Sequence, residues 1–60
     1  MNRIDTYRVE TAGTLDDCAI CGSLAEARRV ASVRVLATGR LQLVWDFGAA
    51  MYVARIYPDR

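Results

Sequence analysis

The stretch that decides the fold is residues 23–45, SLAEARRVASVRVLATGRLQLVW, because its hydrophobic period changes from that of a helix to that of a strand. Ser23 is followed three residues later by Glu26, just before an apolar run. This is the pattern of a capping box, in which the Ser23 hydroxyl accepts from the Glu26 amide and the Glu26 carboxylate reaches back to the Ser23 amide. We therefore predict a helix that begins at Leu24.

The predicted helix carries one apolar stripe that faces the core. At the helical period the stripe consists of Leu24, Ala27, Ala31 and Val35, with Val30 beside it. Glu26, Arg29 and Val33 point the other way. Gly39 is the candidate left-handed residue that closes the helix or the turn after it. We expect the helix to cover about residues 24–36 and to end between Arg34 and Ala37.

After Gly39 the apolar residues alternate, which predicts a half-buried strand. Its inward, core-forming residues are expected to be Leu41, Leu43 and Trp45. A turn at residues 46–48 leads into a second strand, residues 50–57, which Pro58 stops. The two strands should form a hairpin. In the second strand Arg55 should face water, which places Tyr52, Ala54 and Ile56 inward and Met51, Val53 and Tyr57 outward.

The N-terminal third predicts two more strands. Residues 6–11 alternate, with Tyr7 and Val9 inward, and residues 12–17 contain a glycine and two aspartates typical of a turn. Residues 18–21 form a short strand that runs into the helix cap. The predicted fold is a single α+β domain over residues 1–60, in the order ββαββ, with the lone helix packed on one face of a small antiparallel sheet.

Composition narrows the function classes. The chain is 53% hydrophobic and 25% charged, as expected of a folded domain, and its eight basic residues, all arginine, nearly balance seven acids to leave a net charge of +1. This balance argues against a nucleic-acid binder driven by bulk charge and against an acidic DNA mimic. No apolar run is long enough for a membrane span, and the first five residues do not open a signal peptide. We expect a cytosolic protein without a membrane partner.

Catalysis is not expected, because the chain has no histidine and so lacks the usual general base and the usual nucleophile pairs. Asp16, Asp17 and Asp46 fit turn-forming roles better than a catalytic pair of carboxylates. Cys18 and Cys21 have CxxC spacing, yet two ligands cannot complete a tetrahedral zinc site within one chain. We expect two strand thiols and no cofactor or metal, with a zinc shared by a dimer and a redox pair as the open alternatives.

Two surfaces are candidates for binding a partner. The first is a basic surface that offers contacts to phosphate or carboxylate, made by Arg28, Arg29, Arg34 and Arg40 on or just beyond the helix and by Arg55 on the sheet. The alternative for these arginines is a solvated helix face. The second is an apolar outer sheet face of Val44, Met51, Val53 and Tyr57, which would suit homodimerisation.

Residues 23–44 resemble a group of small phage-encoded proteins. The resemblance rests on the capped Ser23-Leu24, the helix segment AEARRVAS over residues 25–32, Gly39, and the alternating LQLV of residues 41–44. The group includes anti-CRISPR inhibitors of type I surveillance complexes, in which an antiparallel sheet curls around one helix. The resemblance implies a stoichiometric inhibitor that docks on a guide-RNA complex and blocks nucleic-acid recognition with its arginines.

Other functions remain open at this point. One is a small homodimeric regulator that binds nucleic acid directly, against which the net charge of +1 counts. Another is an accessory subunit whose apolar sheet face completes a partner. The expected partner is a host protein or ribonucleoprotein complex, a homodimer is a further possibility, and direct binding of nucleic acid is left undecided.

Overall fold

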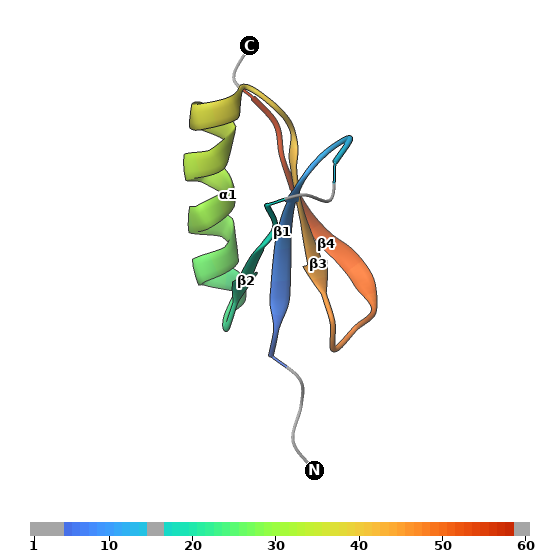
Figure 1. The fold of residues 1–60 in the computed structure, drawn as a ribbon. Helices are drawn as coiled ribbons and strands as arrows, with labels where there is room; N and C mark the ends of the chain where they lie inside the picture. The colour runs from blue at the N-terminus through green and yellow to red at the C-terminus, as the bar shows by residue number, and fades with distance from the viewer. Residues whose placement is uncertain (1–4, 15–16, 59–60) are drawn as a thin grey trace.

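The structure, a computed structural model, describes residues 5–14 and 17–58. Its elements are β1 (Tyr7–Thr11), β2 (Ala19–Cys21), α1 (Leu24–Thr38), β3 (Gln42–Asp46) and β4 (Met51–Ile56). The strands form one antiparallel sheet in the order β2-β1-β3-β4, and α1 lies across one of its faces (Figure 1). The predicted α+β fold with the order ββαββ is confirmed. The predicted turn at residues 12–17 is described only in part, because residues 15 and 16 lie outside the described ranges.

Local signals set both ends of α1. Ser23 Oγ accepts from the Glu26 amide at 3.1 Å, as predicted, whereas Glu26 Oε1 accepts from the Gly22 amide at 3.2 Å rather than from that of Ser23. Gly39 has a φ of 68° and donates to the Val35 carbonyl at 2.8 Å, which confirms its left-handed capping role. The helix continues to Thr38, two residues beyond the expected end at residue 36 and one beyond the expected limit at Ala37.

The core lies between α1 and the sheet. The stripe predicted for the helix is confirmed, since Ala27, Ala31 and Val35 are buried and Leu24 and Val30 pack against the core. The sheet contributes Tyr7, Val9, Cys21 and Val44. Small side chains on the helix allow its backbone to approach the sheet closely, which leaves little room for large side chains between the two layers.

The predicted inward face of β3 is wrong. Val44 is fully buried against the helix, while Leu43 and Trp45 are half-buried on the opposite face and Leu41 lies half-buried before the strand. Because side chains alternate along a strand, a shift of one residue moves the whole apolar set to the other face. The polar residues Gln42 and Asp46 therefore lie on the helix side together with Val44. Val44 also does not belong to the outer apolar patch in which the sequence placed it.

Hydrogen bonds to neighbouring groups in the fold explain how Gln42 and Asp46 are accommodated on the helix side. The Gln42 amide nitrogen donates to Thr11 Oγ1 at 3.0 Å, and Thr11 Oγ1 donates to Gln42 Oε1 at 3.2 Å. Asp46 Oδ1 accepts from the amides of Gly48 at 2.8 Å and Ala49 at 3.1 Å, so that its carboxylate organises the β3–β4 turn. A buried polar group with such partners is not penalised as an unpaired one would be.

A β-bulge changes the orientation of β4. Val44 pairs with Ala54, but Trp45 pairs with Tyr52, so one extra residue of β4 lies at this point. Ala54 and Ile56 pack against the core as predicted, whereas Tyr52 lies on the opposite face, beside Trp45.

Over residues 5–14 and 17–58 no helix has both the length and the apolar character needed to cross a membrane.

Candidate binding face

The sheet face that α1 leaves uncovered, here called the open face, carries a row of side chains across all the strands. Arg8 pairs with Ile20 on one side and with Trp45 on the other, and Trp45 pairs with Tyr52. Paired residues of antiparallel strands point to the same face. Their neighbours along the strands, such as Val9 and Val44, are buried on the helix side. The row therefore runs Ile20, Arg8, Trp45, Tyr52 from β2 to β4.

A second row on the open face lies beside the first. Glu10 pairs with Leu43, and Leu43 pairs with Arg55. Leu43 is half-buried and Arg55 is exposed. This row thus combines one aliphatic side chain with one charge of each sign.

Arg8 lies at the centre of the open face. Its Nε donates to Glu10 Oε1 at 2.8 Å. Its guanidinium carbon lies 5.8 Å from the ring centroid of Trp45 and 5.6 Å from that of Phe47, which is in the β3–β4 turn. Both distances fall within the range of cation–π attraction. These contacts hold the guanidinium among aromatic rings, where the loss of side-chain entropy on binding a ligand is reduced.

Glu10 is almost completely covered, at 4% exposure, although it lies on the face without a helix. One carboxylate oxygen accepts from Arg8, and the other accepts from the Tyr52 hydroxyl at 2.8 Å. The hydrogen bond to Glu10 raises the pKa of Tyr52, with smaller contributions in the same direction from desolvation and from the negative charge of Glu10. The Tyr52 ring also meets that of Trp45 edge-on, with centroids 4.9 Å apart.

The open face therefore combines exposed rings with positive charge. Ile20 is 63% exposed and Phe47 and Tyr52 are each 39% exposed. The single acid of the two rows, Glu10, is buried and already bound to Arg8 and Tyr52. The arrangement can stack planar groups, bury aliphatic groups and hold an anion.

The arginines singled out from the sequence do not form one surface. Arg28 and Arg29 are exposed on α1, and Arg40 is exposed in the segment after it. Arg55 follows the inward-facing Ala54, so it lies on the open face, away from the helix. Sequence reasoning joined residues that the structure distributes over opposite sides of the sheet.

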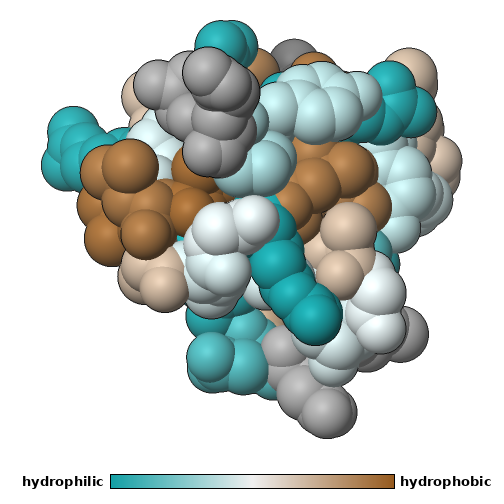
Figure 2. Space-filling model, turned by 90° about the horizontal axis from the view of Figure 1, so that it is seen from above, coloured by the Kyte–Doolittle hydropathy of each residue, from teal (hydrophilic) through white to brown (hydrophobic). Residues whose placement is uncertain are grey.

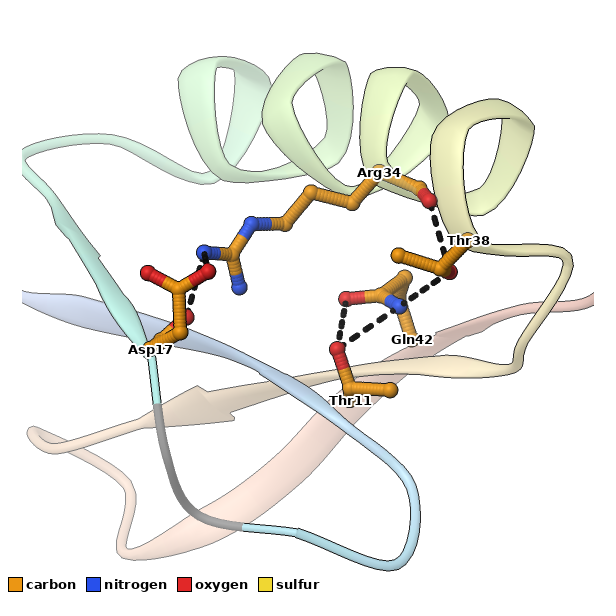
Figure 3. A network of polar contacts seen from close by, with 5 residues as sticks. All are labelled: Thr11, Asp17, Arg34, Thr38 and Gln42. Atoms are coloured by element: carbon orange, nitrogen blue, oxygen red, sulfur yellow. Dashed lines mark hydrogen bonds and ion pairs between the residues drawn. The ribbon is translucent and has the colours of Figure 1, made fainter.

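Arg34 has a different role, because its side chain contacts the segment before β2. Its Nη2 donates to the Asp17 carbonyl and lies 3.4 Å from the Asp17 carboxylate (Figure 3). In the same view Thr38, one turn further along α1, lies close to Gln42, which bonds to Thr11 on β1. Arg34 thus links α1 to the β1–β2 connection and is only partly available to a partner.

Sequence reasoning missed the residues that form the centre of the open face: Arg8, Glu10, Ile20, Trp45, Phe47 and Tyr52. One signal was present, because Arg8 and Glu10 are opposite charges two positions apart on a predicted strand and so share a face. Trp45 and Tyr52 were assigned to the core. Their true side depends on the register of β3 and on the bulge in β4.

The two cysteines have different surroundings. Cys21 is buried in the core, and desolvation raises the pKa of its thiol, aided by Glu26 and opposed by Arg34. Cys18 is half-buried just before β2, and both residues are thiols. Among residues 5–14 and 17–58 no group of three or more possible ligands is placed to hold a metal ion. Cys21 thus has the surroundings of a packing residue.

A shallow pocket lies along β4 at the edge of the sheet. It is open, has a volume of about 250 Å³, and is lined by Tyr52, Val53, Ala54, Arg55 and Tyr57.

Figure 2 views the molecule from the end at which α1 finishes, and shows apolar atoms interrupted by hydrophilic ones rather than one continuous patch. This end of the molecule is therefore a poorer candidate for apolar docking than the open face.

Comparison of the chain with protein-family models, curated proteins and solved structures gives no significant match.

Proposed function

We propose that the protein is a stoichiometric binding domain that docks its open face on a larger host protein or ribonucleoprotein complex. The observation that carries this proposal is the orientation of β3. Its large apolar residues Leu43 and Trp45 lie away from α1, while Val44 lies against it.

Such an orientation is unusual for a sheet covered on one side only. An antiparallel sheet that faces water normally places polar residues on its wet side. Here that side carries Leu43, Trp45 and Tyr52 around Arg8, and aromatic residues and arginine are the residue types that contribute most energy to interfaces. The open face therefore has the composition of a docking surface.

The edges of the sheet are poorer candidates than its face. β2 has only three residues, and β4 contains the bulge next to Tyr52. Short edge strands and bulges are both features that hinder pairing with a strand of another chain. Docking by strand addition is thus disfavoured relative to docking on the open face.

The more specific proposal is inhibition of a type I CRISPR surveillance complex. Its support is the resemblance of residues 23–44 to small phage-encoded inhibitors, together with the docking surface described above. In this form the protein would dock on the complex through the open face and prevent recognition of the target nucleic acid.

The test is a titration of a purified type I surveillance complex with the protein, with binding of labelled target duplex DNA as the readout. We expect DNA binding to fall linearly and to end at a fixed molar ratio. Ile20→Glu, on the open face, should abolish inhibition. Leu36→Glu is the matched control, because Leu36 is 82% exposed on α1. Unchanged DNA binding at excess protein would refute the inhibitor form, and equal loss in both variants would refute docking through the open face.

A further inference from the structure

We infer that the open face binds single-stranded nucleic acid, with bases stacked on Trp45, Phe47 and Tyr52 and phosphates held by Arg8 and Arg55. This inference rests on the proposed function in taking the open face as the docking surface. It adds the chemical class of the group contacted on the partner.

The charges of the open face favour a polyanion. Its two cations are Arg8 and Arg55, whereas the carboxylate of Glu10 is covered and has both oxygens occupied. Because Arg8 is ion-paired with Glu10 at 2.8 Å, the two rows of the open face carry one net positive charge, that of Arg55, and the remaining N–H groups of Arg8 can still donate to a phosphate. A second copy of the chain would bring like charges together, which disfavours self-association through this face.

The aromatic residues select a polyanion with planar groups. Trp45 and Tyr52 belong to the same cross-strand row, and the ring centroid of Phe47 lies 5.6 Å from the Arg8 guanidinium carbon. A four-stranded sheet with aromatic side chains on its uncovered face can bind a single strand by stacking two or three bases on those rings. In a duplex the bases are stacked on one another and are not available to these rings. An acidic peptide would satisfy the arginines but not the rings.

The expected binding is weakly dependent on salt. Two phosphate contacts on a single strand predict a slope of about −1.4 for the logarithm of the association constant against the logarithm of salt concentration. This dependence is compatible with the nearly neutral chain. Removal of one arginine contact should lower the magnitude of the slope by about 0.7.

The experiment uses the fluorescence of Trp45, the one tryptophan of the chain. We expect a short oligothymidylate or oligouridylate to quench it saturably, and a duplex of the same length or polyglutamate to bind at least tenfold more weakly. Arg55→Ala should weaken single-strand binding several-fold and reduce the salt slope. Arg29→Ala removes the same charge from the exposed side of α1, and an equal loss in that variant would overturn the inference.

Absence of quenching by any single strand, or equal binding of duplex or polyglutamate, would also overturn it. Failure here can be distinguished from failure of the proposed function. If the protein inhibits the surveillance complex but binds no oligonucleotide, the inference is wrong and docking through the open face stands. If it binds oligonucleotides but does not act on the complex, the inference stands and the inhibitor proposal is wrong.

Discussion

Glu10 is the residue around which the open face is organised. Its covered carboxylate connects Arg8, which contacts two aromatic rings, to the hydroxyl of Tyr52 on the edge strand. A paired carboxylate at this position orients both side chains before any partner arrives. This order lowers the entropic cost of binding.

The first prediction concerns the titration of Tyr52. Its hydrogen bond to Glu10 stabilises the protonated phenol, so its pKa in the folded state lies above the ordinary value of 10.0. The hydrogen bond therefore stabilises the fold below the ordinary tyrosine pKa, and this contribution is lost as pH rises through the folded-state pKa. Glu10→Gln removes the charge and should lower the pKa of Tyr52, as measured by the phenolate absorbance in a background in which Tyr7 and Tyr57, the other two tyrosines, are replaced by phenylalanine. An unchanged pKa would show that this contact is absent in solution.

The second prediction concerns Ala50, the last residue of the β3–β4 turn. It has a φ of 56° and donates its amide to the Asp46 carbonyl at 2.7 Å. The left-handed conformation costs a non-glycine residue about 1–2 kcal/mol, whereas glycine adopts it freely but loses about 0.5–1 kcal/mol in chain entropy. Ala50→Gly should therefore raise the free energy of unfolding by about 0.5–1 kcal/mol in urea titrations. A decrease would mean that the turn has another conformation.

At the scale of secondary-structure elements, the stability of α1 depends on its N-cap residue, Ser23. Ser23→Ala removes the acceptor for the Glu26 amide and should lower the free energy of unfolding by about 1 kcal/mol. Ser32→Ala is the matched control, because Ser32 is exposed within α1, where alanine is the better helix former. Chemical denaturation of both variants tests the prediction. Equal effects of the two substitutions would exclude the cap as a source of stability.

The helix could be predicted from the sequence because its signals are local. The Ser23 cap, the small apolar stripe and Gly39 each act within one or two turns of α1. Strand β3 could not be oriented in the same way, because its larger apolar residues, Leu43 and Trp45, lie on the open face, whereas Val44 on the helix side is flanked by the polar residues Gln42 and Asp46. Leu43 and Trp45 are together more hydrophobic than Val44. However, the alanines of α1 bring the helix so close to the sheet that the smaller Val44 fits between the two layers. The choice depends on packing between elements far apart in the sequence.

The residues of the open face could not be predicted from the sequence, because their orientation also depends on contacts between distant elements. Trp45 and Tyr52 were expected in the core, one because of the register of β3 and the other because the bulge in β4 is not visible in an alternating pattern. The sequence-based prediction placed Arg55 on the sheet, but it assigned Arg55 to the same basic surface as the arginines of the helix. Only the three-dimensional order of the strands brings Arg8, Trp45 and Tyr52 into one row.

At the scale of the whole molecule, the protein is a two-layer domain with an uncovered second side (Figure 1). The interior is built mainly from alanine and valine with Tyr7, and many of the larger apolar and aromatic residues, such as Ile20, Leu36 and Phe47, are exposed. A single small core of this kind supplies only about 3–5 kcal/mol of stability. Binding a partner on the open face would cover the apolar surface that the fold leaves exposed.

The orientation of β3 is the central claim, and paired substitutions on its two faces test it most directly. Urea unfolding of Leu43→Asn and Val44→Asn, followed by Trp45 fluorescence, compares a half-buried residue of the open face with a fully buried residue of the core. We predict a loss of about 1 kcal/mol for Leu43→Asn and of about 3 kcal/mol or more for Val44→Asn, which is most of the stability that so small a core supplies. The reverse order, with Val44→Asn folded and Leu43→Asn unfolded, would contradict the account.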